Sequence, residues 1–288
     1  MNRSPSMSRP IRLFLPVFVL LGLLTGCQAE KTATSRGLAP ATTGAGRPTA
    51  AVAASPLAGS TQLLLVVAKD WNSNQARLRR FARTGTGPWR PVGDDIAVTL
   101  GKNGLGWGLG LHGAAPSSGP VKVEGDGRSP AGVFTLSTAF AYHPEDLWRP
   151  SKMPMHRITE RTVCVETIDS KSYNRIVDED DVTPRDWESP DRMLRPDGLY
   201  RYGLFVDHNA PKTKAGAGSC IFLHLWRRPG APTVGCTAMN EPAMQAIQVW
   251  LDASRKPLLV QLPQAELLRL APAWGAPELT IPPQRNDE

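Results

Sequence analysis

Two side chains near the C-terminal end of the chain could together perform acyl transfer: His224 and, twelve positions later, Cys236. A thiol becomes a strong nucleophile when a neighbouring base removes its proton, and an imidazole can be that base. The backbone N–H groups of residues 234–236 could converge on a developing oxyanion, because Gly235 lets the chain approach a substrate closely. We therefore predict Cys236 as the nucleophile, His224 as the general base and acid, and Gly235 as a backbone oxyanion donor. The alternative is a buried cysteine beside a hydrogen-bonded core histidine.

The residues around this pair predict a strand, a turn and a helix. Residues 220–226 are apolar and aromatic, and they predict a buried strand that carries His224 near its end. Beyond Cys236, Asn240 can cap a helix, and apolar residues recur at helical spacing over 244–251. The thiol is therefore expected in a tight turn between this strand and this helix.

These residues resemble the L,D-transpeptidase catalytic domains, also called YkuD-like, whose signature is a strand ending in histidine followed by Ser/Thr-x-Gly-Cys. Residues 222–224 (Phe-Leu-His) and 233–236 (Thr-Val-Gly-Cys) match that signature. Residues 124–134 (Glu-Gly-Asp-Gly-Arg-Ser-Pro-Ala-Gly-Val-Phe) resemble the glycine-rich turn that leads into a strand in the same family. The loop before Gly-Cys is shorter here than usual, and Val234 and Leu225 stand where the family commonly has a histidine and a polar residue.

The resemblance implies a cell-wall enzyme without a cofactor, whose partners are peptidoglycan stem peptides. Cys236 would attack the carbonyl that follows an L-centre of a stem peptide, and an acceptor amine would resolve the thioacyl-enzyme. If water resolves it, the enzyme is an L,D-peptidase. A hypothesis from another class is a catalytically silent lipoprotein that only binds the wall. A papain-type protease is excluded by chain order, because there the cysteine precedes the histidine.

The glycine-rich segment also has two interpretations from its residues alone. Gly-Asp-Gly and Ser-Pro punctuate residues 125–132, which predicts a turn before a strand that resumes at Val133. The turn could be a plain hairpin connection with Arg128 exposed. Alternatively, Arg128 or Asp126 could line the substrate cleft.

The remaining histidines are weaker candidates for the base. His208 also ends a predicted strand, residues 202–208, and is the rival to His224. His112, His143 and His156 lie in loop-like sequence and are expected at the surface. No His-x-x-x-His or Cys-x-x-Cys spacing occurs in the sequence, so we expect no metal site.

The N-terminal residues predict export and a lipid anchor. Three arginines precede or border an apolar stretch over residues 13–24, which is shorter than the ~20 residues of a membrane span. Residues 24–27, Leu-Thr-Gly-Cys, resemble the lipobox of bacterial lipoproteins. We predict a signal peptide over residues 1–26 and a lipid on Cys27, with a plain secretory signal or a short anchor as alternatives. Gln28, by the sorting rule of Gram-negative lipoproteins, implies the outer membrane and a periplasmic domain.

The rest of the chain predicts one mostly β domain between two loose segments. Residues 27–60 are rich in Ala, Pro, Thr and Gly and predict a flexible tether, and residues 265–288 predict a loose proline-rich tail. Residues 61–264 suffice for one core. Short strands are predicted over residues 62–68, 76–82, 96–100, 133–137, 162–167, 202–208, 220–226 and 258–262. The expected fold is a sandwich or barrel with one or two packed helices, and the resemblance implies the same β-rich, YkuD-like fold.

Charge and cysteine content add two expectations. The net charge is +7, but no long basic run with interleaved aromatic residues occurs, so we expect no nucleic-acid partner. With Cys27 lipidated and Cys236 reactive, Cys164 and Cys220 remain as an even pair in an oxidising compartment. A Cys164–Cys220 disulfide is therefore the candidate pairing, and two buried free thiols are the alternative.

Overall fold

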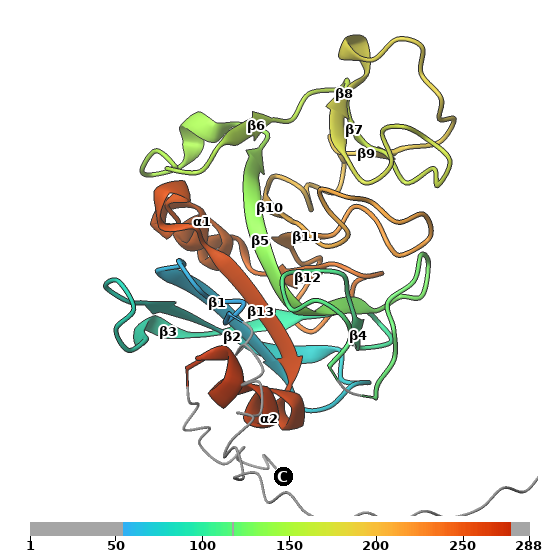
Figure 1. Cartoon of the computed structure of the whole chain (residues 1–288). Helices are drawn as coiled ribbons and strands as arrows, with labels where there is room; N and C mark the ends of the chain where they lie inside the picture. The colour runs from blue at the N-terminus through green and yellow to red at the C-terminus, as the bar shows by residue number, and fades with distance from the viewer. Residues whose placement is uncertain (1–53, 117, 278–288) are drawn as a thin grey trace, which may run out of the picture. The chain divides into compact units, whose positions relative to one another are not determined.

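The computed structural model describes residues 54–116 and 118–277, and an eight-stranded mixed β-barrel forms their centre (Figure 1). The strands follow the order β10–β11–β12–β3–β2–β1–β13–β5, and β5 pairs back with β10 to close the ring. Their bounds are β1 (Gln62–Ala68), β2 (Gln75–Ala82), β3 (Arg90–Thr99), β5 (Ser129–Ala141), β10 (Tyr202–Val206), β11 (Phe222–Leu225), β12 (Thr237–Met239) and β13 (Leu258–Pro263). Of the two architectures expected from the sequence, the protein adopts the barrel.

Two strand pairs of the barrel are parallel, and one of them contains the strand β1, which is buried on both faces. β1 pairs with β13, and β11 pairs with β12, both in parallel, whereas the other six pairs of the ring are antiparallel. A parallel pair needs a crossover connection rather than a hairpin. Leu63 and Leu64 of β1 point to opposite faces of the strand, and both are fully buried. β1 is buried on both faces because side chains fill the barrel interior and α2 packs on the outside.

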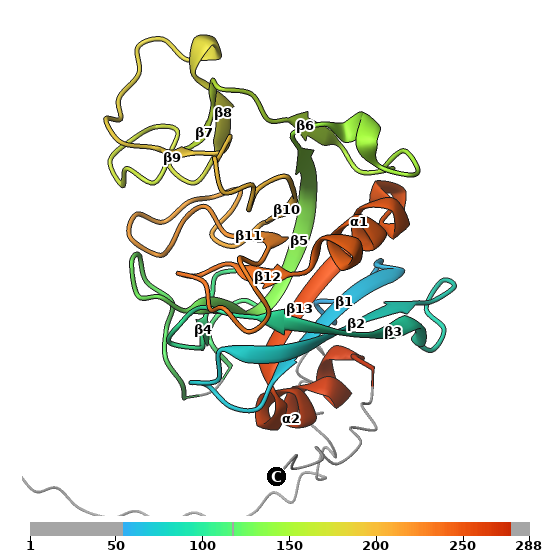
Figure 2. The ribbon, with the colours of Figure 1, turned by 180° about the vertical axis from the view of Figure 1, so that it is seen from behind.

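Two helices flank β13 in the chain and lie at its two ends (Figures 1 and 2). The first, α1 (Glu241–Trp250), confirms the predicted helix: the Asn240 side chain accepts the N–H of Ala243, and Met244 and Ile247 are buried. It packs against β10 and β11, the strands next to the candidate site.

The second helix, α2 (Gln264–Trp274), corrects the prediction of a loose segment from residue 265. Leu267, Leu270 and Trp274 are buried along one side of it, against β1 and β13. The loose tail is predicted because this region is rich in proline. Pro272 nevertheless lies in the last turn of the helix, which is capped by Gly275 with φ 62°. Residues 278–288 of the predicted tail lie outside the described residues.

Shorter elements surround the barrel. β4 (Leu105–Trp107) and β6 (Met155–Arg157) extend the barrel sheet by parallel pairing with the two ends of β5. β7 (Thr162–Cys164), β8 (Ile176–Asp178) and β9 (Asp191–Arg192) form a separate three-stranded sheet, which lies beside β6 in Figure 2. Three single 3-10 turns cover Pro144–Asp146, Glu179–Asp181 and Ala253–Arg255.

All eight predicted strands exist, with differences at their bounds. Residues 62–68 match β1, whereas residues 96–100 cover only the end of β3, and 133–137 only the middle of β5. The expected strand 220–226 begins two residues later, because Cys220 adopts a left-handed conformation with φ 52°. Five further strands, β4, β6, β8, β9 and β12, have only two or three residues each and too little periodicity to be predicted from the sequence.

The predicted disulfide is confirmed, and it ties the three-stranded sheet to the barrel. Cys164 at the end of β7 is bonded to Cys220, just before β11. The predicted tether, by contrast, is wrong at its C-terminal end, because Leu57 is fully buried in the core. The predicted signal peptide and Cys27 lie outside the described residues. Within residues 54–116 and 118–277, no helix is long and apolar enough to cross a membrane.

Candidate active site

The parallel pairing of β11 with β12 brings the predicted histidine and cysteine together. His224 lies opposite Ala238 in this pair, and Cys236 immediately precedes β12. The thiol therefore lies beside Phe222, whose backbone N–H donates to Cys236 Sγ at 3.3 Å. Residues 226–236 form the crossover that a parallel pair requires. The twelve-residue spacing is thus that of two neighbouring strands and their connecting loop.

His224 and Cys236 line the same pocket, a cavity of about 250 Å³. Tyr200 also lines it, and its ring stands edge-on to the imidazole of His224, with the ring centroids 5.2 Å apart. Val234 borders the same pocket and is 79% exposed, whereas the side chains of both candidates are only 6% exposed. A buried thiol and a buried imidazole thus face one small cavity.

One hydrogen bond determines which nitrogen of His224 can act as a base. Nδ1 lies 2.8 Å from the carbonyl oxygen of Leu225. A carbonyl only accepts, so Nδ1 carries the proton, and the lone pair of the neutral ring is on Nε2. Burial lowers the pKa of His224 to about 4, and the bond to Leu225 opposes part of that shift. The imidazole is therefore neutral at pH 7 and able to accept a proton.

The thiol of Cys236 is protonated in this structure. Burial raises its pKa to about 12, the N–H of Phe222 opposes the shift, and the nearby carboxylates of Asp191 and Glu166 add to it. The Sγ–H group points toward the carbonyl of Cys220, 3.6 Å away. A thiol in this state becomes nucleophilic only when a base takes its proton during the attack.

Two carboxyl groups near the thiol are themselves shifted toward their neutral forms. Burial raises the pKa of Asp191, although the hydroxyl of Tyr200 donates to it at 2.8 Å. The pKa of Glu166 is raised to about 7, first by reduced hydration and then by the negative charges of Asp191 and Glu124, although part of its side chain reaches solvent. Both shifts favour the uncharged forms of these two carboxyl groups.

The turn before Cys236 is held by two hydroxyl groups. Thr233 Oγ1 donates to the carbonyl of Cys236 at 2.6 Å and accepts the N–H of Gly235 at 3.1 Å. Ser129 Oγ donates to the same carbonyl at 2.8 Å. The predicted oxyanion donor Gly235 therefore has its N–H engaged, and it could serve a substrate only by leaving Thr233. The other predicted donors are the N–H groups of Val234 and Cys236.

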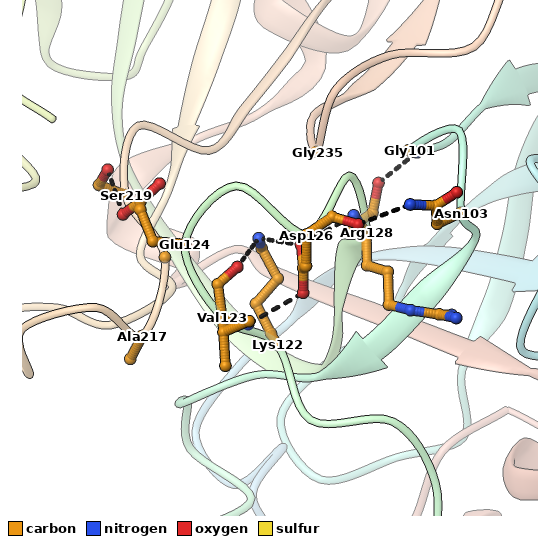
Figure 3. A network of polar contacts seen from close by, with 12 residues as sticks. Gly101, Asn103, Lys122, Val123, Glu124, Asp126, Arg128, Ala217, Ser219 and Gly235 are labelled. Atoms are coloured by element: carbon orange, nitrogen blue, oxygen red, sulfur yellow. Dashed lines mark hydrogen bonds and ion pairs between the residues drawn. The ribbon is translucent and has the colours of Figure 1, made fainter. Parts of the chain in front are cut away.

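The glycine-rich segment is held by its own polar contacts, which Figure 3 shows around Asp126 and Arg128. Asp126 accepts the backbone N–H groups of Val123 and Arg128 and so closes the turn. The guanidinium of Arg128 donates to the backbone carbonyls of Leu105 and Trp71, and neither residue lines the pocket of Cys236. Neither Asp126 nor Arg128 lines the pocket of Cys236. The link from this segment to the site is Ser129.

A second set of polar contacts holds the segment before β11. The side chain of Asn174 accepts the N–H of Cys220 at 2.9 Å and donates to the carbonyls of His208 and Asn209. Ser219 Oγ donates to the carboxylate of Glu124 at 2.8 Å. These bonds, together with the disulfide, fix the carbonyl of Cys220 and the N–H of Phe222 on either side of the thiol.

The rival base His208 is a structural residue. Its Nδ1 accepts the N–H of Leu109 at 3.1 Å, and its Nε2 lies 2.9 Å from the carbonyl of Ala217. Both ring nitrogens are thus occupied by backbone groups, and burial lowers its pKa to about 4. It does not line the pocket of Cys236.

The three histidines expected at the surface differ from one another. His143 is exposed beside Glu145, whereas His156 is half-buried near Asp178. His112 is also half-buried and accepts the N–H of Val133 through Nδ1. The expectation of surface positions is therefore wrong for His112 and His156.

Sequence reasoning missed Tyr200, Ser129 and Asn174. Tyr200 lies outside every predicted strand, and nothing in its flanking residues marks it as part of a pocket. Ser129 belongs to the recognised motif, but a motif does not say which backbone group a hydroxyl meets. Asn174 has φ 62°, a conformation that asparagine adopts more readily than most residues, but this angle is known only from the structure.

The fold and the site together define a mostly β barrel protein with a buried Cys/His pair facing one pocket. No model of a known protein family matches this chain, and a search of curated proteins finds no match either. Within the two described ranges, no group of three or more His, Cys, Asp or Glu side chains is arranged to hold a metal ion. The functional conclusion therefore depends on the geometry of the site.

Proposed function

We propose that this protein is a peptidoglycan L,D-transpeptidase of the YkuD-like type, which cross-links or remodels the cell wall through a thioacyl-enzyme on Cys236. The observation that carries the proposal is that His224 and Cys236 line one pocket while the carbonyl of Leu225 holds the imidazole proton on Nδ1. This arrangement leaves Nε2 as the base. The motifs of residues 222–224, 233–236 and 124–134 support the same proposal.

In the first half of the reaction, Cys236 Sγ attacks the carbonyl that follows an L-centre of a donor stem peptide. The thiol proton passes to His224 Nε2 as the S–C bond forms, because a thiol with a pKa of about 12 is not ionised beforehand. The negative oxygen of the tetrahedral intermediate accepts hydrogen bonds from the backbone N–H groups of Val234 and Cys236, and from that of Gly235 once it leaves Thr233. His224 then gives its proton to the leaving amine, and a thioester remains.

In the second half, the amine of an acceptor stem peptide attacks the thioester carbon. His224 Nε2 takes a proton from this amine and returns it to Sγ as the C–S bond breaks, so the thiol is restored. Water in place of the amine gives hydrolysis, and the enzyme is then an L,D-peptidase with the same Cys/His pair. No cofactor takes part in either route.

The proposed location is the periplasmic side of a bacterial outer membrane. The lipobox-like residues 24–27 support a lipid on Cys27. The Cys164–Cys220 disulfide supports an oxidising compartment, since structural disulfides persist there and are rare in the cytosol. The lipid would bring the protein to the membrane, and residues 28–53 would separate the anchor from the barrel.

A second candidate function is a catalytically silent protein that binds wall peptides in the same pocket. The observation that favours it is the burial of Cys236, which raises the pKa of the thiol to about 12. A protein without catalytic activity could keep such a thiol as a small buried side chain.

The deciding experiment incubates the full-length protein with purified muropeptides and follows products by mass spectrometry. Cross-linked dimers support transpeptidation, and trimmed monomers identify an L,D-peptidase. Cys236→Ala and Cys236→Ser are the matched variants, and both should lose all product. A carbapenem should acylate wild-type Cys236 and add its mass to the intact protein. An unchanged muropeptide pool together with no covalent adduct on Cys236 would overturn the proposal in favour of the silent protein.

A further inference from the structure

Lys122 is a buried lysine that the proposed mechanism does not use. Its side chain is 4% exposed, although lysine is almost never buried without a partner. The ammonium donates to the carbonyl of Val123 at 2.8 Å and to Asp126 Oδ1 at 2.6 Å. Lys122 precedes the glycine-rich segment and belongs to no strand of the barrel.

The ammonium lies close to the turn that carries the nucleophile. Figure 3 shows Lys122 between Val123 and Asp126, with Gly235 nearby. A Cβ at Gly235 would lie only 4.0 Å from Lys122 Nζ, and Gly235 is the residue before Cys236. A Cβ at Gly218 would lie 3.2 Å from Lys122 Cε, so this second glycine leaves room for the lysine stem.

The ion pair with Asp126 neutralises Lys122 only in part. Oδ1 of Asp126 also accepts the N–H of Arg128, and Oδ2 accepts the N–H of Val123. The carboxylate of Asp126 thus accepts hydrogen bonds from three residues, Lys122, Val123 and Arg128. An ammonium also has three N–H groups, and two of these go to Val123 and Asp126. A buried cation in this state exerts a field on neighbouring groups, because the surroundings screen it weakly.

We propose that Lys122 is a positioning residue of the site, whose buried ammonium stabilises the negative charge that develops on Cys236 Sγ and on the oxyanion at the Gly235 turn. It acts through Cys236 and the turn, without contact to substrate. The inference rests on the proposed acyl transfer at Cys236. The leaving thiol proton still goes to His224 Nε2, and Lys122 takes no part in proton transfer.

Other charged groups near the thiol disfavour a thiolate at Cys236, and the charge of Lys122 acts against them. Asp191 from β9 and Glu166 from the loop after β7 raise the pKa of Cys236, whereas Lys122 lowers it. The hydroxyl of Tyr200 is neutral, since burial raises its pKa well above the ordinary value. The titratable and charged groups that face Cys236, its pocket or Lys122 are Glu124, Asp126, Glu166, Asp191, Arg195, Tyr200, His208, His224 and Arg227. Arg195 is paired with Asp191 and Asp197, and Lys122 is the cation that lowers the pKa of Cys236.

The test compares two variants of one ion pair that change the charge in opposite directions. Alkylation of Cys236 by iodoacetamide is followed from pH 6 to pH 10 on the full-length protein, with peptide-resolved mass spectrometry. Because this range lies below the thiol pKa of about 12, a shift of the apparent pKa is read as a proportional change of the alkylation rate at each pH. Lys122→Met should slow alkylation at pH 8 by about 3- to 10-fold and raise the apparent pKa of the thiol, as expected for loss of one nearby charge. Asp126→Asn should accelerate alkylation and lower that apparent pKa.

A purely structural role predicts a different pattern, because both variants break the same ion pair and should then change alkylation in the same direction. Changes of the same sign, or no change in either pH profile, would overturn the proposal. Lys122→Arg, which keeps the charge, should restore a profile close to wild type. If Lys122→Met does not fold, the faster alkylation of Asp126→Asn decides, and its absence counts against Lys122.

The readout also separates this inference from the proposed function. Alkylation needs no stem peptide, so an inactive wild-type protein with the predicted shifts would reject the transpeptidase alone. Muropeptide turnover that depends on Cys236, without any shift in the Lys122 variants, would reject the role of Lys122 alone.

Discussion

The two halves of the barrel are held together by different means. On one side, β1 pairs with β2 over seven registered residues and with β13 over six. On the other, β10 and β11 share two registered pairs, β11 and β12 share three, and β12 meets β3 at one. The long-strand half has long ladders, and β1 within it is packed on both faces. The short-strand half, which carries His224 and Cys236, has too few ladder bonds to fix its strands by itself.

In the short-strand half, hydrogen bonds from side chains hold backbone groups that have no partner in a strand ladder. Asn174 holds the N–H of Cys220, and Ser129 and Thr233 hold the carbonyl of Cys236. The disulfide adds a covalent link from Cys220 to the three-stranded sheet. We infer from this comparison that the long-strand half contributes most of the stability, whereas the short-strand half carries the site. Changes in the short-strand half should therefore alter the chemistry of Cys236 more than changes in the long-strand half.

The largest expected effect concerns the two buried histidines of the short-strand half. His224→Ala should slow acylation of Cys236 by about 10²–10⁴-fold, the usual contribution of a positioned general base. His208→Ala, whose ring bonds only backbone groups, should leave the acylation rate within about threefold of wild type at temperatures where it is folded. Stopped-flow or mass-based acylation kinetics would measure both rates. The opposite ranking of the two variants would assign the base to His208.

The disulfide comes next. Replacing Cys164 and Cys220 together by serine should lower the free energy of unfolding by ~4 kcal/mol in the chain-entropy account, since the bond spans a separation of 56 residues. It should also change the alkylation rate of Cys236 in the folded protein, because Cys220 lies beside the thiol. Urea unfolding and alkylation would be measured on the same samples.

The control for the disulfide comes from the long-strand half. Leu64→Ala in β1 should cost about 2–5 kcal/mol by leaving a cavity, with no change in Cys236 alkylation of the folded protein. Equal alkylation changes in the disulfide variant and in Leu64→Ala would contradict the proposed division between the halves.

The pH dependence of stability should contain a contribution from His208, in addition to the one expected from His224. Its pKa is about 4 in the folded protein and about 6.5 in an unfolded chain, so the unfolded state binds more protons between these values. This contribution is complete above pH 6.5 and is lost as pH falls toward 4. It amounts to about 3 kcal/mol at most. Urea unfolding at pH 7.5 and 4.5 should show a smaller difference for His208→Asn than for wild type, and an equal difference would disprove the assignment.

The smallest expected effect comes from Asn174, one of the side chains that hold backbone groups in the short-strand half. Asn174→Ala removes the partner of the Cys220 N–H and should cost about 1–3 kcal/mol. It should also shift the pH profile of Cys236 alkylation, because the carbonyl of Cys220 and the N–H of Phe222 would no longer be fixed beside Sγ. Asn103→Ala, an exposed amide bonded to Asp126 in the same protein, is the control and should leave the profile unchanged. An unchanged profile in Asn174→Ala as well would limit this residue to stability.

Much of the fold could be predicted from local patterns. The run over residues 62–68 predicts β1 residue for residue, and Asn240 with the apolar spacing after it predicts α1. The pairing of Cys164 with Cys220 followed from cysteine counting in an exported chain. The wrong or missing predictions also have a physical cause. The prolines around α2 indicate a loose segment, and strands of two or three residues such as β9 have no recognisable period.

The sequence by itself determined which residues could do chemistry, because a thiol, an imidazole and a glycine turn are properties of local residue types and spacing. Only the tertiary structure decided how they can do it. Parallel pairing of β11 with β12 placed both side chains on one pocket, and the carbonyl of Leu225 assigned the basic nitrogen of His224. The ammonium of Lys122 came close to Gly235 across more than a hundred residues of chain. Burial and the positions of distant charges set the pKa of a thiol, and neither can be read from the residues next to it.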